Sequence, residues 1–360
     1  MAARNPGITE LNIRSWAQEY TGARGRVTAP TIGGDVSAAR YAAPLDGQLR
    51  LMTKVARMYH ERGARQADIA LTLNISQAKV SRLLKRAASL GIVRTTVTVA
   101  PGVYADLEEQ LEARFGLAEA VVVDVDSDAD ESETLAAVGA GAAAYLEATL
   151  SGSDRIGVSS WSQTLLAMVD RMRPSPTPRA TEVVQLLGGI GVADAQGHSH
   201  RLLGELARML GASPIYVHAP GIVAGPEIRD SLLEGAGMQD VARRWRHLTM
   251  AVMGIGGIEP SDVLIESGNA FASGERLLLQ DAGAVGDICH RVFRADGSVV
   301  HGELDDRIIA IPVADLLRVP RRVGVAGGTR KLAAIKGAMA GGWVTALVTD
   351  LTTAEQLLAG

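Results

Sequence analysis

Several glycine-containing turns follow predicted strands, and turns of this kind can hold the oxygen atoms of a sugar or a phosphate. Residues 157–164 (GVSSWSQT) place hydroxyl groups at the start of a predicted helix, where backbone N–H groups attract anions. Residues 185–189, 254–257 and 324–331 end three further strands. A single glycine pair is more often only a tight turn, but several at one sheet edge can line a shared pocket. None matches the P-loop or the dinucleotide fingerprint, and we expect no cofactor.

The candidate ligand contacts lie at or near these turns, and each has a plainer structural alternative. Asp287 can accept hydrogen bonds from sugar hydroxyls or only cap a turn, and Trp161 can line a pocket or only pack beneath it. His200 can contact a hydroxyl or lie in a solvated loop, and Lys331 can be an ordinary surface lysine. We predict ligand contacts from nine residues: Ser160, Trp161, Thr164, Gln185, Gly188, Gly189, His200, Asp287 and Lys331.

Metal binding and a disulfide framework are not predicted. His198 and His200 are two residues apart, but the sequence offers no evident third ligand. Cys289 is the single cysteine, and its apolar neighbours indicate an inert core position. One cysteine also favours a cytoplasmic protein. Charged residues interrupt residues 1–20, and no apolar run reaches ~18 residues, so we expect neither a secretory leader nor a membrane span.

A basic segment stands out from an acidic remainder. Ten of the 36 Lys and Arg residues, but only three of the 40 Asp and Glu residues, lie between Asp46 and Arg94. This segment carries a charge of +7, which leaves −11 on the rest of a chain whose net charge is −4. Such an asymmetry predicts a polyanionic partner for the basic segment alone.

Helical spacing predicts three helices in the basic segment, over residues 49–63, 66–73 and 76–90. A tight turn joins the second helix to the third, which is typical of a helix-turn-helix, and residues 92–99 (IVRTTVTV) predict a strand that would form a wing. The alternative is a plain three-helix unit with a solvated basic face. We predict DNA contacts from the third helix: Ser76, Gln77, Lys79, Ser81, Arg82, Lys85 and Arg86.

The remaining chain alternates strands with helices, which predicts an α/β domain with a mainly parallel sheet covered on both faces. Such sheets bind ligands at the carboxyl ends of their strands. Strands are expected at residues 120–125, 155–159, 182–187, 215–218, 249–254, 307–312, 323–326 and 344–348.

The predicted organisation has four parts. They are a flexible tail over residues 1–44, a DNA-binding domain over 45–100, a linker or oligomerisation helix over 101–117, and an effector domain over 118–360. Leu107, Leu111 and Phe115 form a narrow apolar stripe on the linker helix, for which we expect a partner helix.

Taken together, these motifs resemble those of the SorC/DeoR-type sugar-binding transcriptional regulators. The likeness spans Asp46 to the C-terminus and is carried by residues 66–70 (QADIA), 76–84, 283–289 (GAVGDIC), 323–338 (VGVAGGTRKLAAIKGA) and 347–350 (LVTD). The resemblance implies a Rossmann-like effector domain similar to the fold of sugar-phosphate isomerases and CoA-transferases, with Lys331 at the family's ligand lysine. It also implies a tetramer on operator DNA. Ser162 stands where many members have glycine, so phosphorylated and unphosphorylated effectors both stay open.

We interpret the chain as an effector-responsive regulator, not an enzyme, and favour a repressor of carbohydrate or polyol catabolism. Its expected partners are operator duplex DNA, a sugar, polyol or sugar phosphate, and further copies of the chain in a dimer or tetramer. An alternative is an isomerase-like or CoA-transferase-like enzyme with a DNA-binding appendage, but only Asp287 loosely fits the acid–base pair that this requires. A second alternative is a structural nucleoid protein whose large domain only oligomerises.

Overall fold

The computed structural model describes residues 43–95, 100, 102–126, 128–192 and 196–360. These form two compact units, Met1–Val97 and Thr98–Gly360. The predicted flexible tail, residues 1–44, lies outside the described residues except for the start of the first helix at Ala43.

The smaller unit contains three helices, α1 (Ala43–His60), α2 (Gln66–Leu73) and α3 (Gln77–Ser89). Their apolar faces meet in a small core. Asn74 ends α2 in a left-handed conformation with φ of 52°, and the Ser76 hydroxyl caps α3 by accepting a hydrogen bond from the Lys79 N–H at 3.2 Å. The two helices are therefore joined by a turn of only three residues.

The predicted wing strand is not formed in its described part. Residues 92–95 adopt bends and irregular backbone, and residues 96–99 lie outside the described residues. Ile92 and Val93 instead donate backbone hydrogen bonds to the Ala87 carbonyl at the end of α3. For residues 92–95 the β-branched composition therefore predicted the wrong conformation, because the end of α3 uses the N–H groups of Ile92 and Val93.

The larger unit is built on a seven-stranded parallel sheet in the order β1-β10-β9-β5-β2-β3-β4, which confirms the predicted α/β class. Each strand lies within a few residues of a predicted one. The strands are β1 (Glu119–Val123), β2 (Asp154–Val158), β3 (Ala180–Gln185), β4 (Ser213–Ile215), β5 (Met250–Gly254), β9 (Arg321–Val325) and β10 (Ala346–Asp350).

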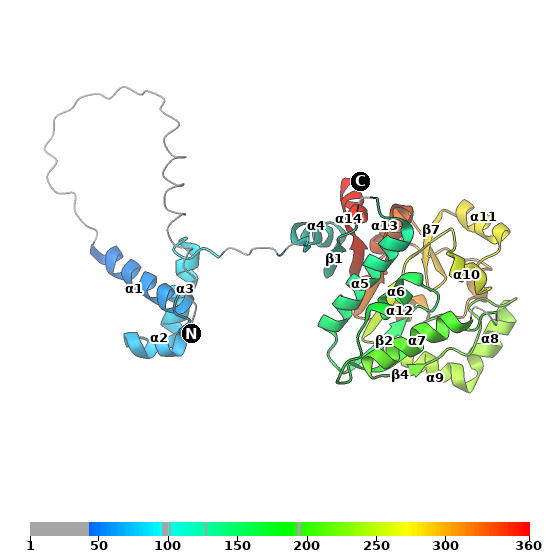
Figure 1. Cartoon of the computed structure of the whole chain (residues 1–360), viewed down its shortest axis with the longest axis horizontal. Helices are drawn as coiled ribbons and strands as arrows, with labels where there is room; N and C mark the ends of the chain where they lie inside the picture. Colours follow the sequence, from blue (N-terminus) through cyan, green and yellow to red (C-terminus); the bar gives the residue numbers. More distant parts are fainter. Residues whose placement is uncertain (1–42, 96–99, 101, 127, 193–195) are drawn as a thin grey trace, which may run out of the picture. The chain divides into compact units, whose positions relative to one another are not determined.

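Helices cover both faces of this sheet (Figure 1). One face packs against α5 (Glu131–Thr149), α6 (Gln163–Arg171) and α7 (Gln196–Leu210). The other face packs against α4 (Ala105–Phe115), α9 (Ala236–Trp245), α13 (Leu332–Ala340) and α14 (Leu351–Ala359). The remaining helices are α8 (Pro226–Glu234), α10 (Asp262–Glu266), α11 (Ser273–Asp281), α12 (Val313–Leu316), η1 (Asp305–Arg307) and η2 (Thr329–Lys331). Within the described residues, no helix is long and apolar enough to cross a membrane.

A small antiparallel sheet, absent from the sequence prediction, adds β6 (Gly256–Gly257), β7 (Ala284–Ile288) and β8 (Arg291–Arg294). The sequence analysis placed the candidate contacts at or near strand-end turns, but Asp287 lies within β7. The predicted strand at residues 307–312 forms only isolated bridges, to Leu187 and Ile222.

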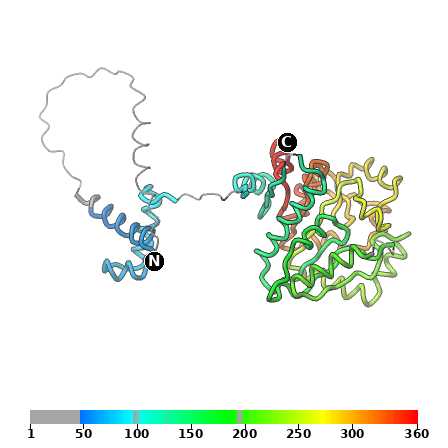
Figure 2. Tube along the Cα trace, in the orientation of Figure 1, coloured from blue at the N-terminus to red at the C-terminus, as the bar shows by residue number. Residues whose placement is uncertain are grey.

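The stripe on α4 is covered by the chain itself. Leu111 is fully buried, and Leu107 and Phe115 pack against the core of the larger unit. The helix contacts β1 and lies beside α14 (Figure 2). The expectation that a partner helix covers this stripe is therefore wrong.

Two left-handed glycines of the larger unit, Gly297 and Gly342, provide a matched test of packing. Gly297 has φ of 79°, and a Cβ there would overlap the Gly341 backbone, whereas Gly342 has φ of 64° and open space around it. We expect Gly342→Ala to destabilise the fold by about 1 kcal/mol through backbone strain alone. Gly297→Ala should destabilise it by an additional ~1–3 kcal/mol from overpacking. Equal denaturation midpoints for the two variants in urea would contradict this packing.

Candidate functional site

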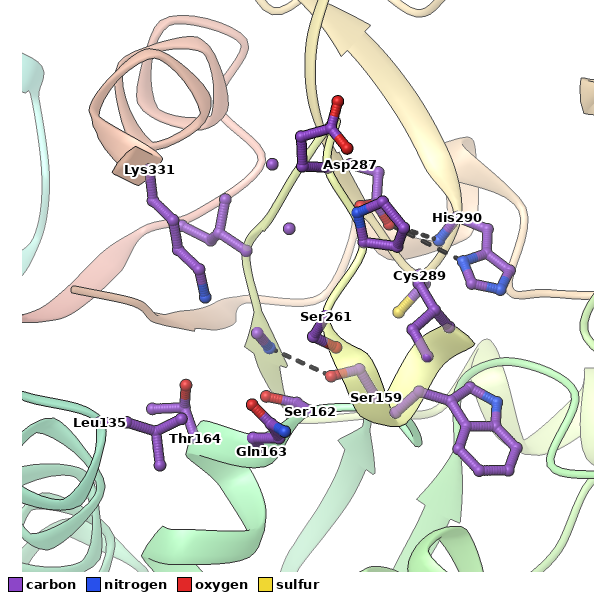
Figure 3. A pocket seen from close by; sticks show the side chains of 18 of the residues that line it. Leu135, Ser159, Ser162, Gln163, Thr164, Ser261, Asp287, Cys289, His290 and Lys331 are labelled. Carbon is purple, nitrogen blue, oxygen red and sulfur yellow. Dashed lines mark hydrogen bonds and ion pairs between the residues drawn. The ribbon is translucent and has the colours of Figure 1, made fainter. Parts of the chain in front are cut away.

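A cavity of about 120 Å³ lies at the carboxyl ends of β2, β5 and β9, where the chain leaves the sheet in three turns (Figure 3). It adjoins a second cavity of about 650 Å³. The two cavities share a wall made of Glu131, Leu135, Thr164, Gly257, Glu259, Arg330 and Lys331.

Serine hydroxyls hold two of these turns in place. The Ser159 hydroxyl accepts a hydrogen bond from the Gly254 N–H at 3.1 Å and so links the turn after β2 to the turn after β5. The Ser162 hydroxyl caps α6 by accepting from the Leu165 N–H at 3.3 Å. Both serines line the smaller cavity, together with Gln163.

Asp287 forms an acidic wall of the cavity. Its Oδ2 atom accepts a hydrogen bond from the His290 N–H at 3.0 Å. Its Oδ1 atom lies over Gly256, the residue opposite it in the β6–β7 pairing, and a Cβ at Gly256 would overlap that oxygen. The absence of a side chain at Gly256 therefore leaves room for the Asp287 carboxylate against β6.

Lys331 forms a basic wall of the same cavity. Figure 3 shows its side chain reaching into the cavity from one side, with Asp287 across from it. Burial lowers the pKa of the Lys331 ammonium below its ordinary value, although the carboxylates of Glu131 and Asp287 oppose this shift. A carboxylate and an ammonium on facing walls, with hydroxyls between them, suit a ligand that both donates and accepts hydrogen bonds.

The second candidate surface is α3 in the smaller unit. Val80, Leu83 and Ala87 turn inward and are buried. The predicted DNA contacts lie on the remaining surface of the helix or at its cap. Ser81 is half-buried, and the other six are exposed: Ser76, Gln77, Lys79, Arg82, Lys85 and Arg86.

Comparisons with known proteins cover most of the chain. Residues 102–359 match the family model described as "Putative sugar-binding domain". The chain is 31% identical over 314 residues to the sorbitol operon regulator of Klebsiella pneumoniae, covering 86% of this chain and 98% of that protein. It is 30% identical over 312 residues to the deoxyribonucleoside regulator of Bacillus subtilis, covering 86% and 97%. The crystal structure of the full-length Klebsiella regulator SorC aligns with a TM-score of 0.66 at 30% identity, over 87% of this chain and 99% of that one.

The chain belongs to the SorC/DeoR-type sugar-binding transcriptional regulators. The predicted resemblance is therefore confirmed, and the chain is a sugar-responsive transcriptional regulator by family. These relatives are named as regulators, which gives no support to the isomerase-like or CoA-transferase-like enzyme that the sequence had left open.

Four of the nine predicted ligand residues of this SorC/DeoR-type regulator line the smaller cavity, namely Trp161, Thr164, Asp287 and Lys331. The other five lie outside the walls of both cavities. His200 is exposed and stacks on Tyr216 with ring centroids 5.0 Å apart. The remaining four are buried, namely Ser160, Gln185, Gly188 and Gly189.

Gln185 is the centre of a buried scaffold below the cavity. Its Nε2 atom donates to the hydroxyls of Ser160 and Ser199, each at 2.7 Å, and its Oε1 atom accepts from the Val217 N–H at 2.8 Å. Gly189 packs directly on this side chain, where a Cβ would overlap Nε2. The Gln185 amide thus joins three segments that are far apart in the sequence.

The sequence analysis missed other residues of the cavity. Cys289 and His290 form the tip of the β7–β8 hairpin, with φ of 53° and 61°, and both line the cavity. Burial raises the pKa of the Cys289 thiol, which keeps it protonated. Glu131 comes from the start of α5, and no sequence motif places it near Lys331. Within the described part of the chain, no three His, Cys, Asp or Glu side chains are grouped to hold a metal ion.

Substitutions of Gln185 and Gln163 test the buried scaffold and the cavity wall separately. Gln185→Leu leaves the Val217 N–H without its acceptor, so we expect a loss of about 1–3 kcal/mol in the free energy of unfolding. Gln163→Leu, at a partly exposed residue of the cavity wall, should leave stability within about 0.5 kcal/mol of wild type. Chemical denaturation of both variants measures the difference. Wild-type stability of Gln185→Leu would show that the scaffold is misassigned.

Proposed function

We propose that the chain is an effector-responsive repressor of a carbohydrate or polyol operon, which binds operator DNA through α3 and its effector in the cavity at the sheet edge. The observation that carries the proposal is the placement of Asp287 and Lys331 on facing walls of this cavity. The relatives named as sorbitol operon and deoxyribonucleoside regulators supply the first probes, D-sorbitol and 2-deoxy-D-ribose.

DNA binding is proposed to use α2 and α3 as a helix-turn-helix. The capped N-terminus of α3 presents Gln77, Lys79 and Arg82 on its exposed side. Glutamine and arginine match adenine and guanine edges in the major groove, whereas lysine suits backbone phosphates. The excess positive charge of this unit supports association with duplex DNA.

The effector is proposed to act by changing how copies of the chain are arranged. A dimer or tetramer would present two α3 helices to half-sites about one helical turn apart, roughly 34 Å. An effector shifts operator affinity only if it binds one arrangement more tightly than the other. The proposal further places the protein in the cytoplasm, gives its larger unit the sugar-phosphate isomerase and CoA-transferase type of fold, and assigns it no catalytic activity.

The DNA-binding half of the proposal can be tested at α3. We expect Arg82→Ala to weaken binding to the cognate operator by about 1–3 kcal/mol and to relax base preference, because a base contact is lost. Arg62→Ala removes the same charge from an exposed position outside α3 and should weaken all DNA sequences slightly and equally. Electrophoretic titration on specific and random duplexes compares the two. Identical behaviour of both variants would remove α3 from the groove.

The effector-binding half can be tested with two lysines on neighbouring turns. We expect Lys331→Ala to weaken effector binding roughly ten- to a hundredfold, since hydrogen bonds to charged groups contribute about 1.5–3 kcal/mol. Lys336→Ala, in α13 and outside both cavities, should respond to effector as wild type does. The measurement is operator affinity across a titration with D-sorbitol or 2-deoxy-D-ribose, which gives the effector concentration for the half-maximal response. An undiminished response in Lys331→Ala would exclude this lysine from the site.

A further inference from the structure

One backbone N–H group at each of the three strand-end turns of the cavity is bonded to a side-chain oxygen of the chain. The Gly328 N–H donates to Asp350 Oδ2 at 2.8 Å and to the Thr353 hydroxyl at 2.9 Å. The Gly254 N–H donates to Ser159, and the Leu165 N–H donates to Ser162. These three N–H groups are therefore not available as donors to a phosphate.

Asp350 places a buried negative charge behind the turn after β9. Its side chain is held by the Thr353 N–H at 2.8 Å and the Thr353 hydroxyl at 2.6 Å. Gly327 approaches it so closely that a Cβ there would overlap Oδ2. Asp350 lines the larger cavity, so an approaching phosphate dianion would meet a like charge in a partly dehydrated environment.

Acids outnumber cations in the lining of both cavities. Among the described residues that line the two cavities, the Lys and Arg side chains are those of Arg330 and Lys331. Arg330 is 73% exposed and donates to Glu131 at 2.8 Å. The carboxylates lining the cavities are those of Asp126, Glu131, Glu259, Asp287 and Asp350.

Hydroxyl groups fit this lining better than a phosphate does. A hydroxyl can donate to Asp287 and accept from Lys331, whereas a phosphate dianion only accepts. Ser261 and Thr164 also line the smaller cavity, and their hydroxyl groups are neutral hydrogen-bond partners for the hydroxyls of a ligand.

From this geometry we infer that the effector is an unphosphorylated polyol or sugar, which is bound through its hydroxyls and is preferred over its own phosphate ester. The inference rests on the proposed function and adds the chemical class of the effector.

Matched pairs of compounds test the inference on the full-length protein. Calorimetric titrations in phosphate-free buffer would compare D-sorbitol with D-sorbitol 6-phosphate, 2-deoxy-D-ribose with its 5-phosphate, and D-ribose with its 5-phosphate, with inorganic phosphate as a further probe. We expect at least one pair to show the unphosphorylated member binding tenfold or more tightly, with no binding of inorganic phosphate. Tighter binding of the phosphorylated member would overturn the inference and leave the proposed function standing. Binding of no member of any pair would count against the proposed function itself.

A charge-neutral variant separates electrostatic selection from shape. Asp287→Asn keeps the size of the side chain but removes its charge, so the preference for the unphosphorylated member should fall at least threefold in the ratio of the two dissociation constants. Asp281→Asn, at an exposed position outside both cavities, should leave this ratio unchanged. A ratio in Asp287→Asn equal to that of wild type would contradict a role for this carboxylate in excluding phosphate. The comparison of compound pairs on the wild type does not depend on how either variant folds.

Discussion

The larger unit depends on one constraint, namely that all seven strands of its main sheet run parallel and are covered on both faces. A parallel strand must be followed by a crossover, so every strand of the sheet leaves at the same edge. In β10 each residue is buried, and β5 and β9 lie side by side at the centre. The turns after β2, β5 and β9 therefore meet, and the cavity lies among them.

The antiparallel hairpin β7–β8 completes the cavity from outside the main sheet. Its two-residue tip places Cys289 and His290 in left-handed conformations, which are strained for residues with side chains and cost about 1–2 kcal/mol each. Both side chains are buried, and the His290 N–H bonds to Asp287. Burial of the hairpin tip thus offsets the strain and fixes the carboxylate that faces Lys331.

Much of this arrangement could be predicted from the sequence, because hydrophobic periodicity and strand-end glycines report on local structure. The parallel strands, the three helices of the basic segment, and Trp161, Thr164, Asp287 and Lys331 in the cavity wall were found in this way. Gln185 and Gly189 carry the same local signal but face the interior, since the Ser199 and Val217 groups that bond to Gln185 come from other segments. Glu131 and His290 reach the cavity only through tertiary packing, which no local pattern encodes. The apolar residues of α4 predicted that another element covers this helix. They did not indicate that β1 and α14 of the same chain do so.

The central claim is that a polyhydroxylated ligand binds at the carboxyl edge of the parallel sheet. Hydrogen–deuterium exchange of the full-length protein, with and without saturating ligand, tests it most directly. The account predicts slower exchange in residues 254–262, 284–291 and 327–332, where the backbone adjoins the cavity. Protection confined to the opposite edge of the sheet, around Arg155, Glu182 and His247, would contradict it.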